Sequence, residues 1–218
     1  MARYAPISPL RGSDSFRRRP GQKPPRSITL IVCEGETEQE YFKAARVRYE
    51  LSTAEIILAE NSEGPAPISV VKCAEEKCGE PGGYDRVFCV FDRDGHESFE
   101  RARARIKTLA SRKKKPLPFE EAISIPCFEL WILLHFEKTD AAFIKCDDVI
   151  HRIRERHMAG YLKADTVVSR QLMANLDAAL ENADWLEVRA ETNAYNPFTS
   201  VHWVLRHFAA VANKDDIS

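Results

Sequence analysis

Two short apolar runs, each ending abruptly at an acidic residue, constrain the fold more than any other feature. Residues 28–33 (ITLIVC) and 86–91 (RVFCVF) are rich in β-branched and aromatic side chains. Such runs are typical of strands buried on both faces of a parallel sheet. The first run ends at Glu34 and the second at Asp92, so both acids are expected at the carboxyl ends of strands.

Segments with helical periodicity separate these runs. Residues 37–48 place Tyr41, Phe42 and Ala45 on one stripe, as an amphipathic helix does. Strands that alternate with helices predict an α/β fold with a mostly parallel central sheet of about four strands, flanked by helices. Further strands are expected at 54–59 and 119–125, and further helices at 68–78, 97–112, 126–136, 147–158, 166–181 and 198–212.

The chain divides into three expected parts. Residues 1–26 carry seven basic side chains and one acid, which predicts a flexible basic N-terminal arm that is either a solvated tail or a contact for phosphates. Residues 27–140 are expected to form the core, and residues 141–218 a helical C-terminal extension packed on it.

The composition favours a cytoplasmic protein but leaves the class of partner open. With 32 basic and 33 acidic side chains, the net charge neither indicates nor excludes nucleic acid. No run of 18 apolar residues is present, which excludes a membrane-spanning helix on length, and the N-terminal region lacks the apolar stretch of a secretory signal.

The six cysteines include no Cys-x-x-Cys pair, so structural zinc is not expected. Several of these cysteines should be buried thiols, which fits a reducing cytoplasm.

The acids at the strand ends predict a metal site. Asp92 and Asp94 are separated by one residue, so in an extended chain both project to the same side. Because working residues gather at the carboxyl ends of parallel strands, Glu34 would complete a carboxylate cage with them. Hard oxygen ligands suit Mg²⁺ or Mn²⁺, and such a site can stabilise displacement at phosphorus. Glu38 either helps to hold a second ion or compensates the dipole at a helix start.

Several stretches together resemble the RloB-like family. They are residues 31–38 (IVCEGETE) with Tyr41-Phe42, residues 91–96 (FDRDGH), residues 124–136 (SIPCFELWILLHF), residues 161–163 (YLK) and residues 196–199 (NPFT). The resemblance runs in order from about residue 26 to residue 210. Ile125 departs from it, because a polar residue, often Asn, is expected at that position.

This resemblance implies a fold, a chemistry and a setting. The RloB-like family looks like part of the Toprim superfamily, whose single glutamate and Asp-x-Asp pair fall on Glu34, Asp92 and Asp94. Overcoming-lysogenisation nucleases, which also have Toprim domains, add acids that resemble Glu38 and Glu129. The family is associated with abortive infection against phage and is often encoded beside an ATPase of the AAA or ABC type. A Mg²⁺-dependent nuclease in antiviral defence, working with such a partner, is therefore implied.

Three further side chains near these motifs each have two possible roles. Glu129 stands in an apolar segment where an unpaired carboxylate is costly, so it either reaches the metal site or meets a polar edge. Lys163 either stabilises charge on a phosphate or is an ordinary surface lysine. His96 either acts on the phosphate or is a loop residue whose hydrogen bonds are satisfied.

A basic segment follows the acidic turn and is either a solvated face or a contact for a polyanion. The expected nucleic-acid contacts are Arg93, His96, Arg101, Arg105, Lys113 and Lys114.

Two alternatives to cleavage stay open. One is a regulatory module that binds a nucleotide or partner through a structural metal site without turnover. The other keeps the fold but transfers nucleotides or joins strands, and the lack of an obvious nucleophilic tyrosine beside Asp92 argues against a topoisomerase. The choice between RNA and DNA, the number of ions and the formation of a homo-oligomer are all left undecided.

Overall fold

The computed structural model describes residues 27–59, 66–81, 83–112 and 117–215. The basic arm expected at 1–26 lies outside these residues, as do Lys113 and Lys114. Among the described residues, no helix has the length and apolar character that crossing a bilayer requires.

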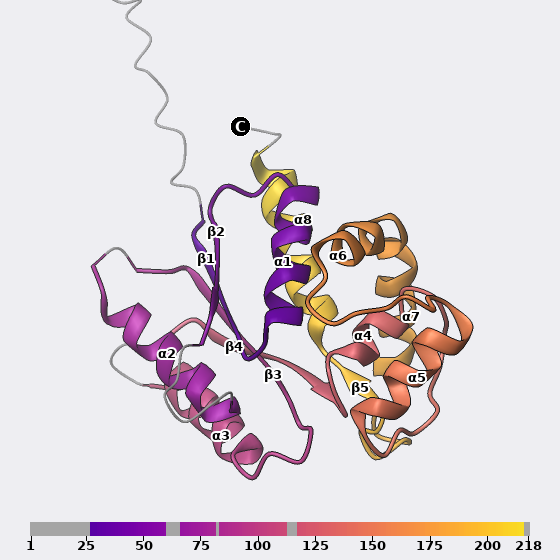
Figure 1. Ribbon diagram of the computed structural model, residues 1–218. Helices are drawn as coiled ribbons and strands as arrows, with labels where there is room; N and C mark the ends of the chain where they lie inside the picture. The colour runs from indigo at the N-terminus through magenta and orange to yellow at the C-terminus, as the bar shows by residue number, and fades with distance from the viewer. Residues whose placement is uncertain (1–26, 60–65, 82, 113–116, 216–218) are drawn as a thin grey trace, which may run out of the picture.

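A five-stranded sheet forms the centre of the molecule (Figure 1). Its strand order is β2-β1-β3-β4-β5. The first four strands run parallel, and β5 is antiparallel to β4. The α/β fold with a mostly parallel sheet is therefore confirmed, with one more strand than expected. The strands are β1 (Thr29–Cys33), β2 (Ala54–Leu58), β3 (Arg86–Asp92), β4 (Phe119–Ile125) and β5 (Phe198–Thr199).

Helices cover both faces of the sheet, which explains why its central strands are apolar throughout. On β1, Leu30 and Val32 belong to the core under α2 (Pro67–Gly79) and α3 (Phe99–Ala110). Ile31 and Cys33 belong to the larger core on the other face. The elements that contribute to this larger core include α1 (Glu36–Arg48), α4 (Glu129–Leu133), α5 (Cys146–Arg156), α6 (Thr166–Leu172), α7 (Leu176–Glu187) and α8 (Val201–Asp215).

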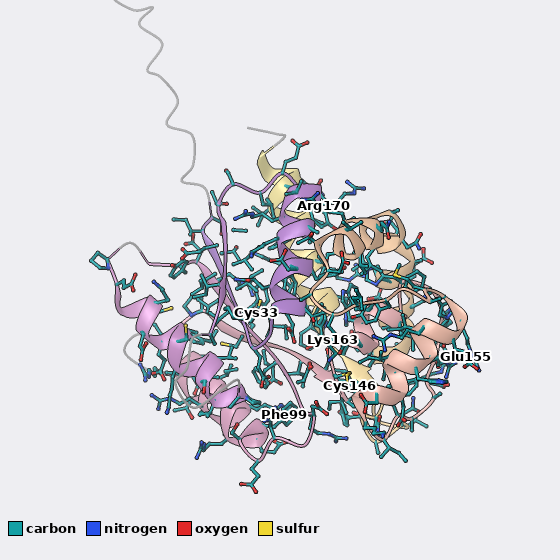
Figure 2. All side chains as sticks on the ribbon, viewed as in Figure 1. Cys33, Phe99, Cys146, Glu155, Lys163 and Arg170 are labelled. Atoms are coloured by element: carbon teal, nitrogen blue, oxygen red, sulfur yellow. A yellow bond between two sulfur atoms is a disulfide. The ribbon has the colours of Figure 1, made fainter. Side chains whose placement is uncertain are left out.

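Helices α4 to α7 form a group beside α1, at the β5 end of the sheet (Figure 1). Helix α4 lies in the segment 27–140 that was assigned to the core, whereas α5, α6 and α7 lie in the segment 141–218. Side chains fill the space between this group and the sheet, and Lys163 and Cys146 lie where the two parts meet (Figure 2).

Three expected helices differ from those observed. The segment 126–136 forms only the short α4: its first residues make a turn in which the Phe128 N–H donates to Asp92, and residues 134–136 are turns. The segment 166–181 divides into α6, a 3₁₀ turn (Met173–Asn175) and α7. The segment 198–212 begins with β5, whose two residues pair with the edge of β4 and are too few to show alternation.

The cysteines divide into two kinds. Cys33 and Cys89 are buried free thiols, as expected, and burial raises the pKa of both well above the ordinary value. Cys127 and Cys146 are joined in a disulfide with a Cα–Cα distance of 5.5 Å, a pairing that was not predicted from the sequence. They are 19 residues apart, and only the packing of α5 against the turn before α4 brings them together.

Candidate metal centre

Glu34 and Asp92 meet at the carboxyl edge of the sheet. Strands β1 and β3 are neighbours, with Cys33 opposite Val90, so the residues that follow lie side by side. The Glu34 carboxylate accepts a 3.1 Å hydrogen bond at Oε2 from the backbone N–H of Asp92. The adjacency of the two strand ends, inferred from the sequence, is therefore observed.

The turn after β4 fixes the two aspartates. The N–H of Phe128 donates to Oδ2 of Asp92 at 2.9 Å. The N–H of Asp94 donates to the carbonyl oxygen of Pro126 at 3.1 Å. Neither partner was identified from the sequence, because both are backbone groups whose position depends on β4 lying next to β3.

Glu38 joins this cluster from the first turn of α1. Its side chain is buried, and burial raises its pKa to about 7, with a further contribution from the charges of Glu129 and Glu34. A Cβ atom at Gly35 would lie 2.7 Å from Oε2 of Glu38, so a residue without a side chain leaves room for this carboxylate. Glu38 therefore has both expected features, a place at a helix start and proximity to the other acids.

Two carboxylate oxygens in the cluster are buried without any hydrogen-bond partner, Oε1 of Glu34 and Oδ1 of Asp92. Burial raises the pKa of Asp92 well above its ordinary value, and the charge of Glu38 adds to the effect. The pKa of Glu34 is also raised, chiefly by burial. Buried polar atoms without partners are uncommon in proteins, and a cation between these oxygens would satisfy them.

The acids offer carboxylate oxygens, the ligand type that a hard divalent cation prefers. Within the described ranges, no three of the acids Glu34, Glu38, Asp92 and Asp94 bring oxygen atoms within 4.8 Å of one another. Mg²⁺ is commonly bound through only one or two carboxylates, and waters fill its other positions. Two adjacent acids are therefore enough protein ligands for it. Asp94 is exposed beside the buried pair, where it interacts electrostatically with Glu34.

Glu129 and Lys163 form an ion pair that borders the acid cluster. The Glu129 side chain is 2% exposed, and its Oε1 lies 3.0 Å from Nζ of Lys163. The hydroxyl of Tyr161 lies 3.5 Å from the same oxygen. Burial lowers the pKa of Lys163, but the charges of Glu129, Asp92 and Glu38 outweigh it and raise that pKa overall. The ammonium group therefore faces several carboxylates at once.

His96 is close to the acids, whereas His135 is a core residue. The Nε2 atom of His96 lies 3.4 Å from Oε1 of Glu34 and is partly exposed. The ring of His135 is buried and contacts the Tyr41 hydroxyl and the Trp131 carbonyl oxygen at 3.0 and 2.9 Å.

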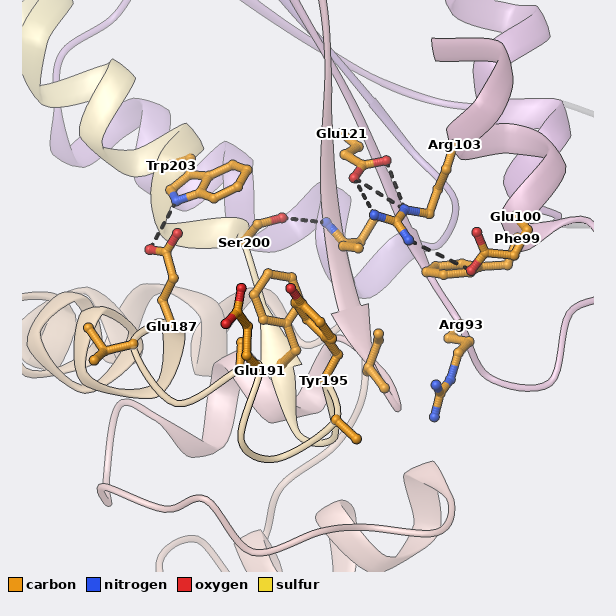
Figure 3. A pocket seen from close by; sticks show the side chains of 16 residues that line it. Arg93, Phe99, Glu100, Arg103, Glu121, Glu187, Glu191, Tyr195, Ser200 and Trp203 are labelled. Atoms are coloured by element: carbon orange, nitrogen blue, oxygen red, sulfur yellow. Dashed lines mark hydrogen bonds and ion pairs between the residues drawn. The ribbon is translucent and has the colours of Figure 1, made fainter. Parts of the chain in front are cut away.

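The expected nucleic-acid contacts are dispersed. Arg93 lines a cavity of about 790 Å³ between α3, β4 and the residues around β5 (Figure 3). Arg105 makes two hydrogen bonds to Glu75, at 2.9 and 2.7 Å, so its charge is neutralised within the molecule. Arg101 is exposed, and the described residues provide it with no hydrogen-bond partner or ion pair.

Two other groups of side chains bring possible ligand atoms within 4.8 Å of one another. One comprises Asp184, Glu187 and His202, and the other comprises Cys127, Glu129 and Cys146. Arg206 pairs with Asp184 in the first group, and the second contains the disulfide.

Comparison with known proteins assigns the chain to a family. The model of the RloB-like protein family matches residues 29–214. No curated protein and no solved structure shows a significant match. The family match covers the whole sheet and almost all of α8, including every element around the acid cluster. The chain therefore belongs to the RloB-like protein family.

Proposed function

We propose that this RloB-like protein is a metal-dependent nuclease that cleaves phosphodiester bonds in RNA, such as tRNA, or in DNA. The observation that carries the proposal is a pair of buried carboxylate oxygens: Oδ1 of Asp92 has no hydrogen-bond partner, and Oε1 of Glu34 makes no hydrogen bond and lies 3.4 Å from Nε2 of His96. Acids at two adjacent strand ends, with a third carboxylate from α1, are the donors that Mg²⁺ or Mn²⁺ prefers.

Each residue has a defined task in this proposal. Glu34 and Asp92 hold the cation, Asp94 adds charge at the exposed side, and Glu38 serves either this ion or a second one. A bound Mg²⁺ supplies positive charge that stabilises the phosphate during displacement.

Lys163 and His96 would act on the phosphate rather than on the ion. Lys163 is half-exposed and is held by Glu129, so its ammonium group can stabilise negative charge on a phosphate oxygen. The Nε2 atom of His96, beside Glu34, can exchange a proton with the attacking or the departing oxygen.

We further propose that the protein acts in the cytoplasm in abortive infection against phage, together with an ATPase of the AAA or ABC type. Membership of the RloB-like family supports this setting. Partner and nucleic acid would meet the catalytic edge near Arg93 and Arg101, whose side chains make no ion pair within the described chain.

The test is an incubation of the pure protein with RNA and with DNA, in Mg²⁺, Mn²⁺ or EDTA, with and without the ATPase encoded beside it. Cleavage that needs the metal and is lost in Asp92→Ala, but kept in the exposed control Asp177→Ala, would support the proposal. Cleavage that Asp92→Ala leaves unchanged would refute the site. Metal binding without turnover under any condition would favour the regulatory alternative.

A further inference from the structure

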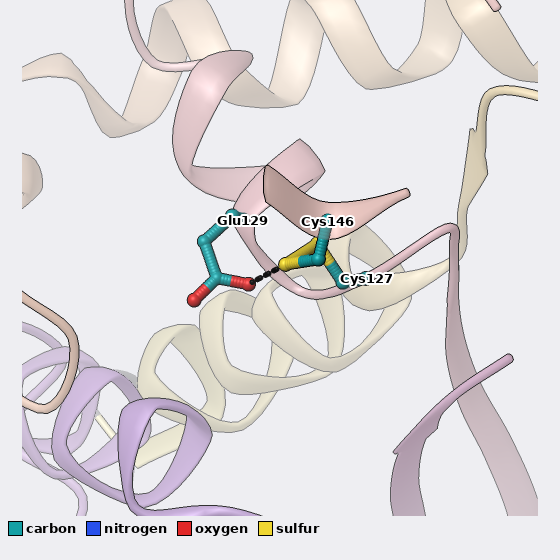
Figure 4. A group of neighbouring side chains, drawn as sticks. All are labelled: Cys127, Glu129 and Cys146. Carbon is teal, nitrogen blue, oxygen red and sulfur yellow. Dashed lines mark hydrogen bonds between the residues drawn. A yellow bond between two sulfur atoms is a disulfide. The ribbon is translucent and has the colours of Figure 1, made fainter. Parts of the chain in front are cut away.

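A disulfide joins Cys127 to Cys146 beside the Glu129 carboxylate (Figure 4). Cys127 stands between Pro126, whose carbonyl oxygen accepts from Asp94, and Phe128, whose N–H donates to Asp92. The disulfide ties this turn to Cys146, the first residue of α5. The bond therefore restrains the segment that positions both aspartates.

The sulfur of Cys146 is also part of a charged group. It lies 3.0 Å from Oε2 of Glu129 and 3.6 Å from Nζ of Lys163. A disulfide sulfur has no proton to donate, so in the oxidised protein both are contacts with a neutral atom. Lys163 then makes its ion pair with Glu129, at 3.0 Å.

Reduction would change this balance of charge. A thiolate at Cys146 would be stabilised by the Lys163 ammonium group and by the N-terminal end of α5, both of which favour negative charge. The same thiolate would stand 3.0 Å from the Glu129 carboxylate and repel it. Lys163 would be divided between two anions, and the turn at Cys127 would lose its covalent anchor.

We propose that Cys127 and Cys146 form a reversible redox site, whose disulfide holds the turn that orients Asp92 and whose reduction by a dithiol releases it. The reductant's two thiols give up two electrons and two protons, which break the S–S bond and form two cysteine thiols, while the reductant becomes a disulfide. The Cys146 thiol then forms the thiolate by releasing its proton to solvent. The regulatory consequence, control of the metal centre, rests on the function proposed above.

The first measurement asks whether the bond is reversible. The full chain is equilibrated in glutathione buffers of graded potential, quenched with a maleimide reagent, and its labelled cysteines are counted by intact mass. Two cysteines should be protected at the oxidising end and released together at the reducing end. Cys127→Ser and Cys146→Ser should each abolish the transition, whereas Cys78→Ser, at a partly exposed free cysteine, should leave it in place. Failure of wild-type protein to protect this pair would overturn the proposal.

The second measurement asks whether the bond holds the turn. Hydrogen exchange is compared between oxidised and reduced wild-type protein, so no variant has to fold. Amides of residues 128–130 should exchange at least about tenfold faster after reduction, and those of the distant helix α2 should be unchanged, because local opening sets the rate of exchange. Equal exchange at the turn in the two forms would overturn the proposal.

Binding of Mn²⁺ separates this inference from the proposed function. If both stand, oxidised protein binds Mn²⁺ about threefold or more tighter than reduced protein. If neither form binds Mn²⁺, the proposed metal centre fails, and the thiol and exchange results still decide the redox site. If both forms bind Mn²⁺ equally, control of the metal centre is refuted.

Discussion

The backbone N–H of Phe128 donates a 2.9 Å hydrogen bond to Oδ2 of Asp92, which occupies one oxygen of that carboxylate with protein. The other oxygen, Oδ1, is buried without a partner. One oxygen is thus fixed by the turn after β4 and the other is left without a partner, in a carboxyl group whose pKa is raised by burial and by the charges of Glu38, Glu129 and Glu34. This asymmetry is what a positioned metal ligand requires.

Replacing Asp92 by asparagine should stabilise the metal-free protein. The amide oxygen of Asp92→Asn can still accept from Phe128, while the substitution removes a buried charge that three other carboxylates disfavour. We expect the free energy of unfolding at pH 8 in EDTA to rise by about 1–2 kcal/mol, as measured in urea. The exposed control Asp177→Asn should change it by less than about 0.5 kcal/mol. A loss of stability in Asp92→Asn would contradict this account of the site.

Gly35→Ala should weaken metal binding more than it affects folding. The new methyl group would lie 2.7 Å from Oε2 of Glu38, so the carboxylate must move. The backbone at Gly35 is extended, with φ −128°, and accepts alanine without strain. We expect Mn²⁺ affinity to fall about tenfold, which corresponds to about 1.4 kcal/mol. Gly160→Ala, where the methyl group meets nothing within 4 Å, is the matched control and should bind normally.

The Glu129–Lys163 pair can be tested by a double-mutant cycle. Lys163→Met leaves a carboxylate that is 2% exposed without its 3.0 Å partner. Because Lys163 is itself half-exposed, we expect a loss of roughly 1–2 kcal/mol, less than for a fully buried pair. Adding Glu129→Gln should recover much of that loss, since no charge is then left unpaired. The control Lys72→Met, at an exposed position on α2, should lower the free energy of unfolding only slightly. If the effects of Lys163→Met and Glu129→Gln add up in the double variant, the two side chains are not coupled.

The contribution of Glu38 to the stability of the metal-free protein should fall as pH rises from about 4.5 to about 7, and it is measured as the difference between wild-type protein and Glu38→Gln. The difference is needed because burial lowers the pKa of His135 to about 4, which changes the total stability in the opposite direction over this range. Burial raises the pKa of Glu38 from 4.5 to about 7, so in this window the unfolded chain releases a proton that the folded chain retains. Each pKa unit corresponds to about 1.4 kcal/mol, so Glu38 alone accounts for roughly 3 kcal/mol.

Mg²⁺ should oppose this loss, because a cation favours the ionised carboxylates. The increase in melting temperature on adding Mg²⁺ should therefore be larger at pH 8 than at pH 5. In EDTA, the stability of wild-type protein relative to Glu38→Gln should therefore decrease through this window. A difference between the two proteins that does not change with pH would mean that Glu38 is ionised in the folded protein at low pH.

The sequence predicted the parts of the fold that depend on local pattern. The apolar runs before Glu34 and Asp92 placed two strands correctly, and their adjacency followed from the rules of parallel sheets. The Phe128 bond to Asp92 joins residues 36 positions apart and involves a backbone group that every residue has. The disulfide and the two-residue β5 likewise depend on tertiary packing, for which a single sequence has no periodic signal.

The central claim is that Glu34 and Asp92 hold a divalent cation at the strand ends, and calorimetric titration of Mn²⁺ tests it most directly. Wild-type protein, Glu34→Gln, Asp92→Asn and the control Asp177→Asn are titrated at pH 8 after removal of metal with EDTA. The account predicts binding to wild-type protein and the control, and at least about tenfold weaker binding to each of the other two variants. Unchanged affinity in Asp92→Asn, or no binding to wild-type protein, would contradict it.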